Sequence, residues 1–354
     1  MAASFIRPAL AKHRGLFHRI AGLYVLLAVT NIAVWVWALT LFRHQPVLLG
    51  TALLAYGFGL RHAVDADHIA AIDNVTRKLM QDDKRPVSVG FFFALGHSTV
   101  VILATAGIAA TATVLGSRFD AFKAVGGFVS ALVSTLFLLV IAAMNSVIVA
   151  GVWRVFRHVR RGGVFAEEDF DFLLNSRGLL ARLFRPAFRL VNHEWHMFPL
   201  GFLFGLGFDT ATEVALLGLS AIQAAQGMPV WSIMVFPALF AAGMSLIDTT
   251  DGILMLGAYN WAFVRPVRKL YYNLLITGMS VVVASLIGGI EGLGLIGSLF
   301  GLKGAFWGGI DSLNDNLNGL GFAIIGLFIL AWAVSVIVSR YLRLDAMDSG
   351  AVER

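Results

Sequence analysis

The sequence predicts an all-α, polytopic membrane protein, and two observations support that class. Of the 354 residues, 58% are hydrophobic and 14% are charged, and the mean hydropathy is +0.80, which is far from the composition of soluble domains. Apolar runs of about 20 residues, long enough to cross a bilayer, recur along the whole chain, and the longest hydrophilic stretch covers only about 154–196. We therefore expect a single integral membrane domain over residues 1–354.

Eight apolar runs are candidate transmembrane helices. They cover about 20–42, 47–76, 87–115, 125–150, 197–223, 230–258, 271–300 and 318–340. The first run is too long for the hydrophobic part of a secretory signal, so we interpret it as a retained span. The glycine-rich segment Gly288 to Gly292 is expected to interrupt the seventh run. The short apolar stretch 294–309 that follows is a candidate re-entrant or interfacial segment.

The basic residues are distributed unevenly between alternate loops. Of the 27 Lys and Arg residues, 22 lie in the two terminal tails and in the loops after the second, fourth and sixth runs. Only four lie in the other loops, and the last, Arg61, lies inside a run. Since cytoplasmic loops carry the excess of Lys and Arg, both termini and the loop at about 154–196 are predicted to be cytoplasmic. Topology thus accounts for the net charge of +6, and we expect contact with a lipid bilayer and none with nucleic acid.

The stretch Arg61-His62-Ala63-Val64-Asp65-Ala66-Asp67-His68-Ile69 places five ionisable side chains inside the second apolar run. A charged side chain at the bilayer centre costs roughly 2.5–3.5 kcal/mol even on lenient scales, so such a cluster faces protein, water or an ion and indicates a functional site. Two imidazoles and two carboxylates, in a chain without cysteine, suit a divalent first-row transition metal. The missing thiolates disfavour copper(I) and structural zinc.

The period of a regular helix refines this ligand set. Four ionisable groups of the second run fall on one broad face at about 100° per residue: His62, Asp65, His68 and Asp73. Asp67 points nearly opposite, so it either serves a neighbouring helix or lies where the helix is distorted. Gly57 and Gly59, just before the cluster, favour such a distortion.

Three later runs carry further ionisable groups. His97 precedes two hydroxyl residues in the third run, Asp209 and Glu213 lie four residues apart in the fifth, and Asp248 and Asp251 lie three apart in the sixth. Helix–helix hydrogen bonding would explain His97 equally well. Structural hydrogen bonds, or pairing with Arg61, would account for one carboxylate but not for four.

A divalent cation is the simplest partner for so many buried carboxylates, with protons as the second possibility. The predicted metal ligands are His62, Asp65, Asp67, His68, His97, Asp209, Glu213, Asp248 and Asp251. Met244, beside the sixth-run carboxylates, is interpreted as a packing residue rather than a ligand.

The chain also aligns weakly with itself. Phe58-Gly59-Leu60 corresponds to Phe204-Gly205-Leu206 at an offset of 146 residues, and Gly96-His97-Ser98 corresponds to Gly243-Met244-Ser245 at an offset of 147. The predicted topology sends the second and fifth runs in opposite directions. We therefore expect an inverted repeat of three spans plus three, with binding groups on glycine-interrupted helices, as in many secondary transporters.

These motifs resemble the signatures of the nickel/cobalt transporter family. The resemblance rests on the stretch Arg61 to Ile69, on Leu95-Gly96-His97-Ser98-Thr99-Val100-Val101, and on the stretches Leu206 to Glu213 and Gly243 to Asp251. It extends over essentially the whole chain and is strongest toward bacterial high-affinity nickel permeases. It implies uptake of Ni²⁺, often with Co²⁺, across the bacterial cytoplasmic (inner) membrane. It also implies that His62, Asp67 and His68 are critical and that the ion is a substrate rather than a cofactor.

Two other readings are compatible with parts of the sequence. An exporter or a proton-coupled metal exchanger would use the same residue types, since an alternating-access site serves either direction. An intramembrane hydrolase would use paired carboxylates, but Gly205-Leu206-Gly207-Phe208-Asp209 lacks the Gly-x-Gly-Asp spacing and no His-Glu-x-x-His motif occurs. No phosphate-binding loop is present either. The chain is thus predicted to be a carrier without enzymatic activity or an evident ATPase subunit.

Overall fold

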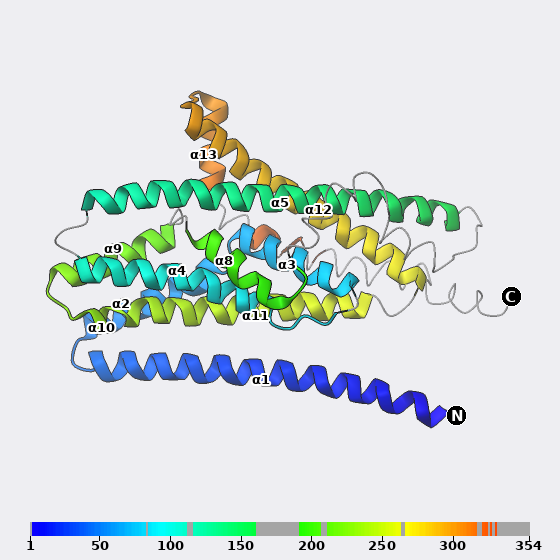
Figure 1. Ribbon diagram of the computed structural model, residues 1–354, viewed down its shortest axis with the longest axis horizontal. Coiled ribbons are helices and arrows are strands. Elements are labelled where there is room, and N and C mark those ends of the chain that lie inside the picture. The colour runs from blue at the N-terminus through cyan, green and yellow to red at the C-terminus, as the bar shows by residue number, and fades with distance from the viewer. Residues whose placement is uncertain are drawn as a thin grey trace. The chain divides into compact units, whose positions relative to one another are not determined.

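The computed structural model describes residues 2–82, 84–111, 116–160, 191–206, 211–262 and 266–316, with a few residues between 321 and 330 (Figure 1). In these ranges every regular element is a helix, which confirms the all-α class. The elements are α1 Ala2–Phe42, α2 Pro46–His62, α3 Ala66–Gln81, α4 Val89–Thr111, α5 Gly116–Arg160, η1 Glu194–His196, α8 Met197–Gly205, α9 Ala211–Ala225, α10 Val230–Ile233, α11 Val235–Ala262, α12 Pro266–Phe300 and α13 Ala305–Asp315.

Five described segments are long and apolar enough to cross a membrane: Gly15–Phe42, Val89–Ala110, Ala131–Gly151, Val230–Tyr259 and Thr277–Phe300. The pair α2 and α3 adds a sixth if it is counted as one broken span. The fifth predicted run consists of two shorter helices, α8 and α9. Most of the eighth run, 318–340, lies outside the described residues. The chain is therefore a multi-pass membrane protein, and the count of eight spans stays a prediction.

The chain divides into two compact units. The first comprises residues 1–64, 85–131 and 193–253, and it contains α1, α2, α4, η1, α8, α9, α10 and most of α11. The second comprises residues 65–84, 132–192 and 254–354, and it contains α3, most of α5, the end of α11, α12 and α13. Each unit is described below by itself.

In the first unit, glycines allow two helix pairs to pack backbone against backbone. Gly59 of α2 lies against the Phe240 backbone of α11, and Gly243 of α11 lies against α2. Likewise, Gly96 of α4 lies against the backbone of α8, and Gly201 of α8 lies against the backbone of α4. A methyl group at Gly59, Gly96 or Gly201 would overlap a neighbouring main chain. Such small residues let helices approach closely in membranes.

The two close pairs, α2 with α11 and α8 with α4, correspond to each other under the sequence offsets of 146 and 147. Gly59 corresponds to Gly205, and Gly96 corresponds to Gly243. Gly205 lies against the backbone of His97 on α4. This recurrence of one packing mode is what an internal repeat predicts. The inverted relation of the two halves stays a prediction.

In the second unit, α12 runs unbroken from Pro266 to Phe300, so the expected interruption at Gly288 to Gly292 is wrong. These glycines face a neighbouring helix instead. A Cβ at Gly288 would lie 3.1 Å from Cβ of Leu138 on α5, and one at Gly292 would lie 3.0 Å from Cγ2 of Thr135. Residues four apart share one helix face, so the pair forms a smooth contact surface for α5.

The chain reverses direction after α12. Gly301 and Gly304 have φ of +60° and +129°, values that favour glycine. The helix α13 then returns along α12, with Trp307 near Gly297 and Asn314 near Gly294. The re-entrant character proposed for 294–309 stays a prediction, but its first part is the end of α12 rather than a loop.

Candidate metal centre

The acidic motif of the second run lies at a break between two helices. The helix α2 ends at His62, the N–H of Ala63 still bonds to the Gly59 carbonyl, and α3 begins at Ala66 after its N-cap residue, Asp65. Gly57 and Gly59 lie within α2, so the distortion is real but falls a few residues later than the glycines. The expectation that His62, Asp65, His68 and Asp73 share one helix face is therefore wrong. His62 belongs to α2 and the other three follow the break.

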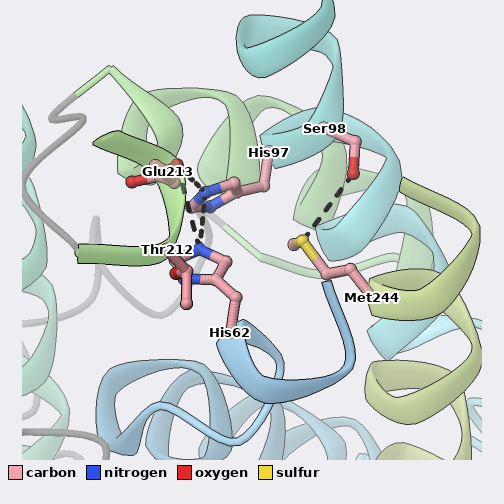
Figure 2. Close-up of polar contacts among 6 residues, drawn as sticks. All are labelled: His62, His97, Ser98, Thr212, Glu213 and Met244. Carbon is pink, nitrogen blue, oxygen red and sulfur yellow. Dashed lines mark hydrogen bonds and ion pairs between the residues drawn. The ribbon is translucent and has the colours of Figure 1, made fainter. Parts of the chain in front are cut away.

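Three buried side chains of the first unit converge on one point (Figure 2). His62 comes from the last turn of α2, His97 from the middle of α4, and Glu213 from the first turn of α9. Their exposed fractions are 1%, 3% and 1%. Figure 2 shows the two imidazoles and the carboxylate pointing toward one another. Three separate helices are thus needed to assemble the cluster.

The donor atoms are close enough together to be ligands of one ion. With metal–ligand bonds of about 2.1 Å, neighbouring donors of a square-planar or octahedral ion lie about 3.0 Å apart and opposite donors about 4.2 Å apart. His97 Nε2 lies 2.9 Å from His62 Nε2 and 2.8 Å from Glu213 Oε1, and the latter two atoms are 3.9 Å apart. With bonds of about 2.1 Å, these distances correspond to ligand–metal–ligand angles of about 85° on either side of His97 and about 135° between His62 and Glu213. Tetragonal coordination by nitrogen and oxygen is typical of Ni²⁺ and Cu²⁺.

The same three atoms are also within hydrogen-bond distance. A proton on His97 Nε2 can be donated to His62 Nε2 or to Glu213 Oε1, but a ring nitrogen donates its single proton once. A divalent ion at this point would satisfy all three atoms together. It would also neutralise a carboxylate that is costly to bury alone.

The residues around the cluster fix the orientation of its rings. Thr212 Oγ1 lies 3.3 Å from His62 Nδ1, the ring nitrogen that faces away from the cluster. A partner on that second nitrogen sets the tautomer and the direction of a metal-binding imidazole. The Phe240 ring lies 5.5 Å from the His62 ring, centroid to centroid. The Thr212 hydroxyl and the Phe240 ring thus both lie beside the His62 imidazole.

Met244 lies close to the cluster without belonging to it. It is fully buried in the apolar core of the first unit, and Ser98 Oγ donates to its sulfur at 3.7 Å. Figure 2 shows this contact beside the His62–His97–Glu213 group. The interpretation of Met244 as a packing residue agrees with this position.

The remaining predicted ligands are distributed over both units. Asp248 is fully buried on α11 of the first unit, and Asp251 follows on the same helix. In the second unit, Asp65 and His68 are buried at the start of α3, and Asp67 lies in its first turn. Asp209 lies outside the described residues. Their participation in metal binding stays a prediction from the sequence.

Asp73 belongs to a separate buried polar network in the second unit. Its carboxylate accepts hydrogen bonds from Tyr259 Oη and from Ser280 Oγ, the latter at 2.6 Å. One residue later, Asn74 Oδ1 accepts from Arg77 Nη2 at 2.7 Å and from Asn145 Nδ2 at 2.8 Å. Asp73, which the sequence analysis placed on the same helix face as His62, is thus held by structural hydrogen bonds.

Sequence reasoning missed Thr212, Tyr259 and Ser280. Thr212 directly precedes Glu213, which the sequence analysis had named as a candidate metal ligand. Its position could therefore have marked it as a residue of the site. Tyr259 and Ser280 lie in ordinary apolar stretches with no local pattern to mark them. Only the packing of α11 and α12 in the second unit brings them to Asp73.

A multi-pass helical membrane protein with a buried imidazole–carboxylate cluster has the features of a metal-ion carrier. Residues 48–338 match the sequence profile of the high-affinity nickel-transport protein family, NicO, and the chain belongs to that family. No solved structure matches the chain significantly.

Several characterised relatives are similar along most of the chain. A high-affinity nickel transport protein of Cupriavidus necator is 61% identical over 323 residues, which is 91% of this chain and 92% of the relative. The hydrogenase nickel incorporation protein HupN of Bradyrhizobium diazoefficiens is 56% identical over 327 residues, 92% of this chain and 85% of its own. The cobalt transport protein NhlF of Rhodococcus rhodochrous is 38% identical over 328 residues, 91% of each.

Proposed function

We propose that this protein takes up Ni²⁺, and Co²⁺ as a second substrate, across the bacterial cytoplasmic membrane as a secondary transporter. The observation that carries the proposal is the spacing of His62, His97 and Glu213, which suits one divalent ion. The relatives support it, since two are named for nickel and one for cobalt. The protein acts in this proposal as a carrier without a resident cofactor, and the ion is its substrate.

The proposed orientation places both termini and the 154–196 loop in the cytoplasm. Contacts in the first unit support it, because segments assigned to the same side touch. Arg19 Nη2 of α1 lies 2.6 Å from Glu194 Oε1, and Arg19 Nη1 donates to the Arg85 carbonyl at 3.1 Å. The Ser88 N–H donates to Glu194 Oε2 at 2.7 Å. The end of the N-terminal tail, the loop before α4 and the segment before α8 thus lie together.

The membrane potential alone supplies enough free energy for uptake. Moving one charge through 100 mV is worth about 2.3 kcal/mol, so a divalent ion gains about 4.6 kcal/mol. At about 1.4 kcal/mol per factor of ten, this supports a concentration ratio of about 2,000-fold. Neither ATP hydrolysis nor proton cotransport is then required. An exporter or obligate proton exchanger would use the same ligands and is the alternative that the experiments must separate.

The test is uptake of radioactive nickel by cells that express the protein, with and without an uncoupler. His97→Ala and Glu213→Gln should abolish uptake while leaving the protein in the membrane. His44→Ala is the matched control, because His44 is an exposed histidine in the turn between α1 and α2. Wild-type uptake by both cluster variants would overturn the proposed site.

A further inference from the structure

A second pair of imidazoles lies just before α8. His193 and His196 flank the short helix η1, in the sequence His193-Glu194-Trp195-His196. The N–H of His196 donates to the His193 carbonyl at 3.1 Å, which closes a single tight turn. Residues three apart eclipse each other in such a turn. The two rings therefore stand side by side, with centroids 5.3 Å apart.

This separation suits two imidazoles that bind one ion. A ring centroid lies about 3.2 Å from an ion bound at about 2.1 Å from its nitrogen. Ligand angles between about 90° and 120° then place the two centroids about 4.5–5.5 Å apart. The observed 5.3 Å falls inside that interval. His193 is exposed and His196 is half-buried, so water can complete the coordination.

Contacts of Glu194 and Trp195 hold this turn in place, and the Trp195 ring stands edge-on to the His196 ring with centroids 4.2 Å apart. Glu194, between the two histidines, bonds to Arg19 on α1 and to the Ser88 N–H. The pair thus lies on the side of the first unit where segments of the predicted cytoplasmic face meet. A site there would meet an ion after it has crossed the membrane.

A short helix connects this pair to the buried cluster. The helix α8 begins at Met197, directly after His196, and ends at Gly205, which lies against His97. Its nine residues rise about 13 Å at about 1.5 Å each. The His193–His196 pair and the buried cluster therefore lie at opposite ends of α8, within the same unit.

We propose that His193 and His196 form a second divalent-metal site, which receives Ni²⁺ released from the His62–His97–Glu213 cluster toward the cytoplasm. The inference rests on the proposed nickel uptake and deepens it. Conduction through several sites requires that each binds well enough to accept the ion and weakly enough to release it. One exposed and one half-buried imidazole with water ligands meet that requirement better than a second buried cluster would.

The other explanation is that the turn anchors α8 at the membrane surface. Trp195 is 57% exposed, and aromatic side chains collect at that level of a bilayer. Equilibrium dialysis of the detergent-solubilised full-length protein against Ni²⁺ separates the two explanations. The wild type should bind about two ions, and His193→Asn/His196→Asn and His97→Ala/Glu213→Gln should each bind about one. The variant with all four changes should bind none, and Trp195→Phe should still bind two.

These outcomes distinguish the inference from the function on which it rests. A wild-type protein that binds no Ni²⁺ would overturn the proposed function itself. A wild type that binds one ion, with the same single ion retained in His193→Asn/His196→Asn, would overturn only the second site and leave the anchoring explanation. In uptake assays, the same variant should lower kcat and KM together about threefold and leave kcat/KM unchanged, since release slows while entry does not. An unchanged kcat would contradict the relay.

Discussion

Thr212→Val tests how the buried cluster is oriented. The exchange keeps the shape of the side chain but removes the hydroxyl that lies 3.3 Å from His62 Nδ1. Loss of a partner on the outer nitrogen of a metal-binding imidazole typically costs 10- to 100-fold in affinity, which corresponds to about 1.4–2.7 kcal/mol. Because this hydrogen bond is long, we expect the lower end, a rise in the KM for Ni²⁺ of about tenfold.

The assay is the concentration dependence of nickel uptake, normalised to the amount of protein in the membrane. Thr212→Ser is the matched control, since it retains the hydroxyl and should leave KM within about twofold. An unchanged KM in Thr212→Val would refute the orienting role. An equal rise in both variants would show that packing, and not the hydrogen bond, matters at this position.

Three further predictions follow from the topology, the packing and the driving force. Reporter fusions after Arg161 and at the C-terminus should both report a cytoplasmic location, and a periplasmic signal from either would contradict the topology. Gly201→Val should destabilise the protein by about 1–3 kcal/mol, measured as a lower Tm, because the new side chain overlaps α4. Gly218 faces open space, so Gly218→Ala should not lower the Tm. Proteoliposomes with an inside-negative potassium–valinomycin potential and no pH gradient should accumulate Ni²⁺, more slowly in acid because protons compete for the ligands. No accumulation under that potential, together with accumulation under a proton gradient alone, would instead indicate obligate proton coupling.

Composition and charge pattern were sufficient to predict the helical membrane class, and the individual ligand candidates were visible as ionisable groups in apolar runs. His62, His97 and Glu213 were all on the predicted list. The convergence of these three side chains on one point was not predictable from the sequence. It depends on how α2, α4 and α9 pack, and no local pattern encodes that arrangement. The offset of 146 residues aligns Asp67 with Glu213 in the sequence, and this correspondence does not place Glu213 beside His97.

The errors share one physical cause, which is that glycine has two roles in membrane helices. Gly57 and Gly59 were expected to distort the second run, but the helix continues through both and ends at His62. Gly288 and Gly292 were expected to break the seventh run, but they make the contact with α5. The local sequence shows only that a glycine is present. Its neighbours in space decide whether it bends its helix or lets another helix pack closely against it.

The most direct test of the central claim is the ligand shell of the bound ion. X-ray absorption at the nickel edge, on full-length protein loaded with about half an equivalent of Ni²⁺ so that the tighter site fills first, reports ligand type and number. The structure predicts nitrogen and oxygen ligands at about 2.1 Å, with outer-shell scattering from at least two imidazoles and none from sulfur. In the His193→Asn/His196→Asn background, which lacks the proposed second site, His97→Ala should remove about one imidazole from that shell. An unchanged imidazole count in His97→Ala would contradict the assignment of the His62–His97–Glu213 cluster as the binding site.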